Sequence, residues 1–145
     1  MPRDFIKIGQ LMLNGGTWRG ERILSEEYVK RASGRLYHLR RIYYGYLWWG
    51  IDLPYKDRTI HAYFAGGNGG QGTFVIPELD LVIGTWGGNY ASRVTFFLQQ
   101  EVIPNYILPA VREEGDDPEA PVMVGTYETI YGPSDETGPV APEDQ

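Results

Sequence analysis

Residues 59–87 read "TIHAYFAGGNGGQGTFVIPELDLVIGTWG", and this stretch decides the fold. It holds three segments rich in β-branched and aromatic residues, which favour strands: residues 59–65, 72–77 and 81–87. The sequence "PELD" at residues 77–80 predicts a tight turn, so the last two segments should form an antiparallel hairpin. Successive strands joined by turns indicate an antiparallel sheet and an α+β fold rather than alternating β-α-β units.

The segment before this stretch predicts one more strand. Residues 42–53, "IYYGYLWWGIDL", are dense in aromatic and β-branched residues. Because side chains alternate between the two faces of a strand, we expect one face to carry Tyr44, Tyr46 and Trp48, and the other Tyr43, Gly45, Leu47 and Trp49. One face should pack on helices, and the other should line a cleft or stay exposed.

Two helices are predicted before the strands. Residues 2–16, "PRDFIKIGQLMLNGG", give an amphipathic helix whose apolar stripe is Phe5, Ile8, Leu11 and Met12. A short turn or hairpin around Gly20 follows it. Ser25 then caps a second helix, which ends near Gly34.

A third helix is predicted after the strands. Residues 92–111 are apolar and helical in pattern, with Ser92 as the cap and Pro104 as an interruption. The predicted architecture is therefore an antiparallel β-sheet with flanking helices, in one domain and without internal repeats.

Charge is distributed unevenly along the 145 residues. Residues 1–111 hold 12 Lys and Arg against 9 Asp and Glu, whereas residues 112–145 hold 1 against 10. The net charges are therefore +3 and −9, which together give the −6 of the whole chain. We predict a folded unit over residues 1–111 and an acidic, Pro/Gly-rich tail over residues 112–145, mostly disordered or docked through residues 121–131. The acidic tail disfavours nucleic acid as a partner.

Several classes of protein are disfavoured by what the sequence lacks. There is no apolar run of about eighteen residues, so no membrane span is expected. The first ten residues have no signal-peptide pattern, and the cellular compartment stays undetermined. With no cysteine, and with His38 and His61 far apart without a carboxylate at ligand spacing, no metal site is expected.

The glycines at 67, 69 and 72 have the G-x-G-x-x-G spacing of a dinucleotide-binding loop. That loop requires a helix opening on the glycines, because the helix N-terminus holds the pyrophosphate. A β-hairpin is predicted to follow instead, so we expect no nucleotide cofactor. Two interpretations remain: a wide turn with positive φ values at Asn68 and Gly69, or a strand edge whose N–H groups point into a substrate cleft.

Three blocks of the sequence resemble the C-terminal portion of serine β-lactamase-like hydrolases. These blocks are "RDFIKIGQLMLNGGTWRGERILSEEYV", "YYGYLWWGID" and "AGGNGGQGTFVIPELDLVIGTWGGN", and their order carries the resemblance. The group includes class C β-lactamases, penicillin-binding D-alanyl-D-alanine carboxypeptidases, related esterases and 6-aminohexanoate-dimer hydrolases. The resemblance covers residues 2–111, which would then form the C-terminal part of a β-lactamase/transpeptidase-like fold.

The resemblance implies acyl transfer on an ester, amide or lactam substrate, with no cofactor. In this family a serine in Ser-x-x-Lys attacks a carbonyl, beside a strand with a Lys/His-Thr/Ser-Gly motif. Gly67, Asn68 and Gly69 fall at these three strand positions. Gly70 would give the N–H of the oxyanion hole, and Gln71 would be the next side chain to reach the cleft.

The departures from the family pattern limit this implied activity. None of the four serines, Ser25, Ser33, Ser92 and Ser134, has lysine three residues later, and no tyrosine has asparagine two residues later. Gly67 lacks the basic side chain that binds a substrate carboxylate, which favours an esterase-like or amidase-like branch. The chain is therefore expected to supply the strand side of a cleft and to be inactive alone.

Two alternatives remain open at this point. The chain could be a non-catalytic module whose aromatic strand face stacks on sugars or apolar ligands. It could also be a subunit that completes a cleft with a separate chain carrying Ser-x-x-Lys. If part of the hydrolase fold is missing, exposed apolar sheet surface should promote self-association. His61 is expected to be a strand-face residue rather than a catalytic base, because a base needs a nucleophile within reach.

Overall fold

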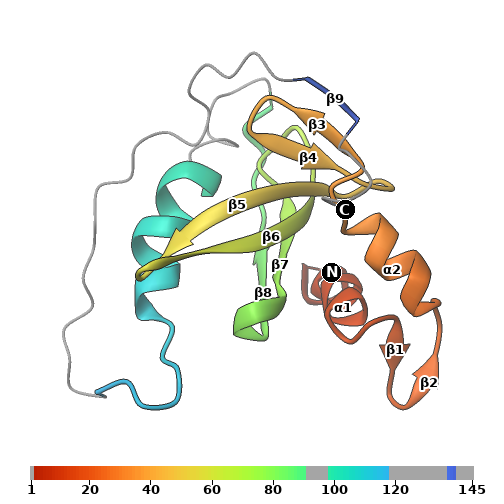
Figure 1. Cartoon of the computed structure of the whole chain (residues 1–145), viewed down its shortest axis with the longest axis horizontal. Coiled ribbons are helices and arrows are strands. Elements are labelled where there is room, and N and C mark those ends of the chain that lie inside the picture. The colour runs from red at the N-terminus through yellow and green to blue at the C-terminus, as the bar shows by residue number, and fades with distance from the viewer. Residues whose placement is uncertain (1, 91–97, 118–136, 140–145) are drawn as a thin grey trace.

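The chain has an α+β architecture in a computed structural model that describes residues 2–90, 98–117 and 137–139 (Figure 1). Seven strands among these residues form one antiparallel sheet in the order β8-β7-β6-β5-β4-β3-β9. Their bounds are β3 Tyr37–Leu39, β4 Ile42–Tyr44, β5 Trp49–Tyr55, β6 Arg58–Gly66, β7 Gly72–Ile76, β8 Leu81–Thr85 and β9 Thr137–Pro139. The predicted fold class is thus confirmed.

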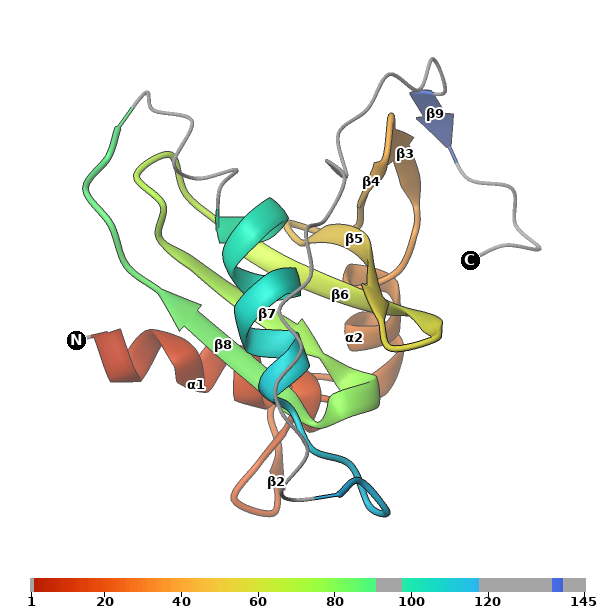
Figure 2. The ribbon, with the colours of Figure 1, turned by 90° about the vertical axis from the view of Figure 1, so that its left-hand side faces the viewer.

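Helices cover both faces of the sheet (Figures 1 and 2). On one face lie α1, Pro2–Leu13, and α2, Glu26–Ala32, joined through a hairpin of β1, Thr17–Trp18, and β2, Glu21–Arg22. On the other face lies η2, Leu98–Ile107, followed by a 3-10 turn, η3, Leu108–Ala110. Another 3-10 turn, η1, Pro77–Leu79, joins β7 to β8.

Two apolar cores result, one on each face of the sheet. Alternation along β7 divides them: Phe74 and Ile76 belong to the core under η2, whereas Val75 belongs to the core under α1 and α2. The first core includes Ile51, Leu53, Ile60, Phe64, Ile103 and Leu108. The second includes Met12, Val29, Ala32, Trp48 and Tyr63.

Helix α1 packs only in part through its predicted stripe, of which Met12 lies in the core. Phe5 and Ile8 of the expected stripe are exposed, Ile8 to 48%. The contact face instead centres on Gly9, where an added Cβ would lie 2.4 Å from Cγ2 of Thr73 and 2.7 Å from Cγ1 of Val82. Because glycine has no side chain, the helix backbone can approach β7 and β8 closely.

The aromatic block is two strands rather than one. The N–H of Gly45 donates to the carbonyl of Trp48 at 2.8 Å, and Leu47 has a φ of 67°, so a turn separates β4 from β5. This turn breaks the expected alternation of side chains between two faces. Trp48 lies in the core with its ring nearly perpendicular to that of Tyr63, whereas Tyr46 and Leu47 are exposed.

The predicted local signals are confirmed in several places. The Ser25 hydroxyl accepts from the Tyr28 N–H at 3.1 Å at the start of α2. The "PELD" turn joins β7 and β8 in an antiparallel hairpin, with Asp80 in the left-handed conformation. Gly20 lies in the β1–β2 hairpin turn at a φ of 84°.

The C-terminal helix differs from its prediction. It does not break at Pro104 but continues past it, with π-helical hydrogen bonds, to Ile107. A proline ring in an α-helix clashes with the carbonyl four residues earlier, and a wider turn relieves that contact. The predicted cap, Ser92, lies outside the described residues.

Two parts of the acidic tail are described, and both contact the body. Glu113 and Asp116 form ion pairs with the β5–β6 turn, and β9 pairs with β3. The predictions of disorder and of docking through residues 121–131 concern residues outside the described part. Among the helices that are described, none combines the length and the apolar character needed to cross a membrane.

Candidate functional site

The five predicted site residues lie together in the loop that joins β6 to β7. The Gly67 N–H donates to the Gln71 carbonyl at 2.9 Å, which closes the loop. The Gly70 N–H donates to the Gly67 carbonyl at 3.3 Å, and Gly70 has a φ of 88°. The loop is therefore the wide turn of the first interpretation, although its positive φ falls on Gly70 rather than on Asn68 and Gly69.

The side chain of Gln71 folds back over this loop. Its Oε1 accepts from the Gly69 N–H at 2.9 Å. A Cβ added to Gly67 would lie 2.4 Å from Nε2 of Gln71, and one added to Gly69 would lie 2.6 Å from its Oε1. Glycine at positions 67 and 69 thus leaves room for the glutamine side chain.

The segment after β8 braces the loop from the other side. The carbonyl of Gly69 accepts from the Asn89 N–H at 3.1 Å, and the carbonyl of Gly70 accepts from the Thr85 hydroxyl at 3.0 Å. A Cβ on Gly87 would lie 2.6 Å from the Gly69 carbonyl oxygen. Two backbone segments therefore pack directly on each other, which requires glycine at both.

The donors of the loop are already engaged within the chain. The Gly70 N–H, the predicted oxyanion donor, faces the Gly67 carbonyl, while Asn68 is exposed. The Gly69 N–H is the one bound by a side chain rather than by backbone. A side chain leaves such a position by rotation about its own bonds, so this donor is the easiest to transfer to a ligand oxygen. The assignment of Gly70 to an oxyanion hole stays a prediction.

A second cluster joins the sheet to the end of α2. Nδ1 of His61 lies 3.0 Å from Oδ1 of Asp52, its cross-strand partner, and Nε2 lies 3.3 Å from the Ser33 carbonyl. The Arg35 guanidinium donates to the same Asp52 oxygen at 2.6 Å. Both ring nitrogens of His61 face acceptors, so a doubly protonated ring donates to both at once.

The neighbours of Asp52 in this cluster lower the pKa of its carboxyl group. Burial raises its pKa, but the hydrogen bond from His61 and the charge of Arg35 outweigh burial, so the pKa of Asp52 lies below its usual range. A carboxylate that orients a histidine is half of a general-base arrangement. The nucleophile of such an arrangement is missing, because Nε2 of His61 faces the Ser33 carbonyl, which has no proton to give. The cluster therefore ties α2 to β5 and β6, as expected for a strand-face His61.

The length of the β5–β6 turn accounts for the pairing of Asp52 with His61. Lys56 and Asp57 form a two-residue turn, since Tyr55 pairs with Arg58. A turn of that length fixes the register of a hairpin, and this register places Asp52 opposite His61. The contributions of Ser33 and Arg35 come from outside the hairpin, so this turn does not account for them.

Replacing Asp52 with asparagine is expected to reduce stability in a pH-dependent way. The folded-state pKa of Asp52 is lowered, so its charge stabilises the fold above the unfolded-state pKa of about 3.9, and this contribution is lost as pH falls through the folded-state pKa. We expect Asp52→Asn to cost about 1–2 kcal/mol at neutral pH, with a difference from wild type that shrinks below about pH 4. Urea unfolding followed by circular dichroism measures this difference.

The control for this variant is Asp57→Asn, because Asp57 lies in the β5–β6 turn and is exposed. Asparagine suits turns as well as aspartate does, so a change below about 0.5 kcal/mol is expected at every pH. A stability difference for Asp52→Asn that stays constant from neutral to acid pH would contradict the assigned role of its charge.

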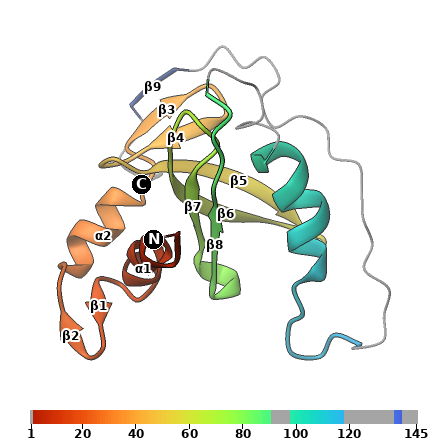
Figure 3. The same cartoon turned by 180° about the vertical axis from the view of Figure 1, so that it is seen from behind.

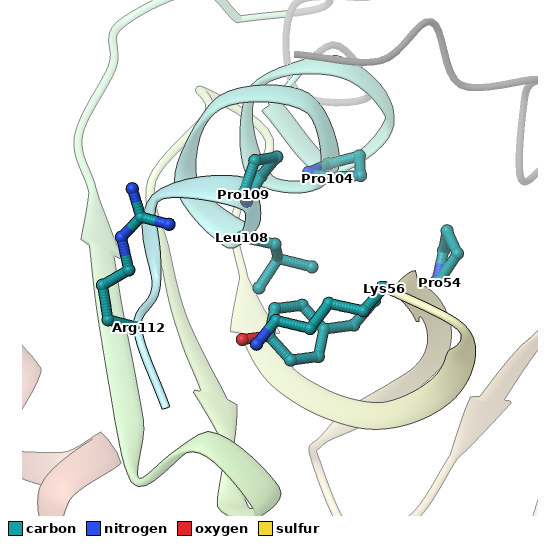
Figure 4. Close-up of a pocket in the computed structure, with 7 residues that line it drawn as sticks. Pro54, Lys56, Pro104, Leu108, Pro109 and Arg112 are labelled. Carbon is teal, nitrogen blue, oxygen red and sulfur yellow. The ribbon is translucent and has the colours of Figure 1, made fainter. Parts of the chain in front are cut away.

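A cavity of about 250 Å³ lies between the β5–β6 turn and residues 104–112 (Figure 4). Its walls are mostly apolar, and they comprise Pro54, Tyr55, Lys56, Pro104, Leu108, Pro109 and Arg112. Lys56 is already paired with Glu113 at 2.9 Å and with Asp116 at 2.7 Å. An anionic ligand would have to displace these carboxylates.

No metal-binding cluster of three or more His, Asp or Glu side chains is found within residues 2–90, 98–117 and 137–139. No family model matches the chain, and a search of curated proteins finds no significant match. The functional interpretation therefore depends on the quoted motifs and on the geometry of the glycine loop.

Proposed function

We propose that this chain forms the strand side of an acyl-transfer cleft in a serine hydrolase of the β-lactamase-like kind. The substrate would be an ester, amide or lactam, and its carbonyl oxygen would take the place of Gln71 Oε1 on the Gly69 N–H. The Gly70 N–H would be the second donor after it leaves the Gly67 carbonyl. The observation that carries the proposal is the hydrogen bond from the Gly69 N–H to the Gln71 side chain.

The glycine loop suits such a role for a physical reason. Oxyanion stabilisation requires fixed backbone donors that a substrate can approach without meeting side chains. The loop is held by backbone hydrogen bonds on both sides, and the glycines leave its surface without Cβ atoms. Gly69 and Gly70 are buried, and the Gln71 side chain and the Tyr90 ring both lie against Gly69.

The nucleophile must come from outside the described residues. The hydroxyl of Ser25 caps α2, and the hydroxyl of Ser33 donates to the Val29 carbonyl at 2.8 Å. Ser92 and Ser134 lie outside the described part, and neither has lysine three residues later. The proposal therefore includes a Ser-x-x-Lys segment that this chain does not contain. Such a segment would cover apolar surface of the sheet, and we propose that the chain self-associates through this surface when the segment is absent.

The aromatic-module alternative is not proposed further. It relied on Trp48 and Tyr46 sharing one open strand face. Trp48 is only 6% exposed, and the turn at residues 45–48 separates the two side chains. A buried ring of this kind cannot stack on a ligand.

Two measurements on the whole chain test the proposal. A fluorophosphonate probe should label none of its serines, because none has the lysine three residues later that would activate it. In 15N–1H spectra, dimethyl phosphate, which mimics a tetrahedral oxyanion, should shift the Gly69 and Gly70 amides, and at least several-fold more strongly in Gln71→Ala. Sodium chloride at equal ionic strength is the control.

Each measurement has an outcome that contradicts one part of the proposal. Labelling of any serine would show that the chain carries its own nucleophile. Absence of amide shifts in both wild type and Gln71→Ala would remove the oxyanion-binding role of the loop.

A further inference from the structure

The edge of the sheet at β3 is covered by the C-terminal segment of the same chain. Strand β9 pairs antiparallel with β3, and the register joins Tyr37 to Pro139, His38 to Gly138 and Leu39 to Thr137 (Figures 1 and 3). β9 is the last strand in the sheet order, so β3 would be the edge without it. An uncovered edge exposes backbone N–H and C=O groups that can pair with another extended segment.

The turn next to this edge is basic. Strand β3 is joined to β4 by Arg40 and Arg41, since Leu39 pairs with Ile42, and both arginines are exposed. Arg40 has a φ of 58°, a conformation that asparagine and glycine adopt at lower cost.

The segment that contains β9 is acidic. Asp135 and Glu136 directly precede Thr137 in the sequence, and Glu143 and Asp144 follow Pro139 by a few residues. Thr137 pairs with Leu39, the residue before Arg40 and Arg41. In the sequence, an acidic pair therefore precedes Thr137, and a basic pair follows its partner Leu39.

The tail already binds basic residues of the body at its other described end. Glu113 pairs with Arg58 at 2.6 Å, and Lys56 lies within 2.9 Å of both Glu113 and Asp116. The hydrogen bonds that Lys56 donates to Asp116 and Glu113 raise the pKa of Lys56. Exposed pairs of this kind are individually weak, but several together can hold a segment against a surface of opposite charge.

We propose that the edge of β3, together with Arg40 and Arg41, is a docking site for an extended acidic segment, and that its occupant is the C-terminal segment of this same chain. Backbone pairing with β3 sets the direction of the segment, and the two arginines favour acidic sequence beside it. The docked segment also protects the edge from pairing with other chains. This inference does not depend on the proposed hydrolase function.

The lack of cysteines allows a direct test in the full chain. Paired residues of antiparallel strands have Cα atoms about 5.5 or 4.5 Å apart, and both separations fall within the disulfide range of about 4.4–6.8 Å. The double variants His38→Cys with Gly138→Cys, and Leu39→Cys with Thr137→Cys, should each form an intramolecular disulfide under mild oxidation. The matched control is Thr59→Cys with Gly138→Cys, because Thr59 is an exposed residue of β6, three strands from β3.

Non-reducing electrophoresis and intact mass report the outcome. We expect at least tenfold faster intramolecular oxidation in the two paired variants than in the control. Disulfide-linked dimers as the main product would mean that a second copy supplies the strand, and oxidation no faster than the control would mean that no segment docks. Either result would overturn the proposal.

The role of charge is tested in the His38→Cys, Gly138→Cys background. Adding Arg40→Glu and Arg41→Glu should slow disulfide formation at least several-fold at low salt, and adding Asp135→Arg and Glu136→Arg to that variant should restore it. Arg3→Glu with Lys30→Glu, on α1 and α2, changes the net charge equally and should have a smaller effect. If the reversed arginines leave the rate unchanged, or if the reciprocal reversal does not restore it, the basic turn is not part of the site.

Discussion

Trp48→Ala is expected to lower the free energy of unfolding by about 3–5 kcal/mol, the range for removing a buried aromatic side chain from a core. Trp48 is 6% exposed, and its ring is nearly perpendicular to that of Tyr63 at a centroid distance of 5.4 Å. It joins Met12, Val29 and Ala32, so it connects the sheet to both N-terminal helices. Urea unfolding, followed by circular dichroism, measures the loss.

The matched control is Trp86→Ala, which removes the same side chain from an exposed position. Trp86 is 45% exposed, so a loss of about 1 kcal/mol or less is expected. Equal losses in the two variants would contradict the placement of Trp48 in the core. Unchanged stability with loss of binding to a sugar or an apolar ligand would revive the aromatic-module alternative.

Gly45→Ala is expected to destabilise the fold by about 3 kcal/mol, because it forces one methyl group against backbone. A Cβ at Gly45 would lie 2.0 Å from the carbonyl oxygen of Ala32, the last residue of α2. That oxygen cannot rotate away as a side chain can, so either α2 or the turn at residues 45–48 must shift. The midpoint of thermal unfolding should fall together with the free energy from urea unfolding.

Gly88→Ala is the control for this substitution. An added Cβ at Gly88 meets no atom within 4 Å, and the same replacement reduces the entropy of the unfolded chain. Its effect should therefore be near zero or stabilising by up to about 1 kcal/mol. A loss in Gly45→Ala no greater than that in Gly88→Ala would contradict the close approach of the turn to α2.

Much of the secondary structure follows from local chemistry in the sequence. Ser25 at a helix start, Gly20 in a hairpin turn and the "PELD" turn each satisfy a local backbone requirement, and each occurs where it was predicted. Such features depend on a few neighbouring residues, so a single sequence is enough to identify them.

The features that could not be predicted depend on contacts between distant segments. The turn that divides the aromatic block includes Gly45. Glycine fits at this position because the carbonyl of Ala32 in α2 lies directly against it. The orientation of α1 depends on Gly9 meeting Thr73 and Val82, more than sixty residues away in the sequence. A hydrophobic pattern gives the apolar side of a helix but not the place where a missing side chain lets two backbones approach.

The candidate site also combines a local feature that the sequence indicates with a contact that depends on the folded surroundings. For residues 67–71 the sequence left a wide turn and a strand edge open, and the structure has the turn, with all five residues between β6 and β7. The sequence did not reveal that the Gln71 side chain turns back to the Gly69 N–H, because the direction of one rotatable side chain depends on the folded surroundings.

The order of the strands also limits how this protein can assemble with itself. One border of the sheet is occupied by β9, while no described strand lies beyond β8 at the other. The described strands of this seven-stranded sheet therefore leave one open border on each molecule. Two molecules that met at β8 around a two-fold axis would both use that border, and the product would be a closed pair. A filament built through the two borders of this sheet would require the release of β9 first.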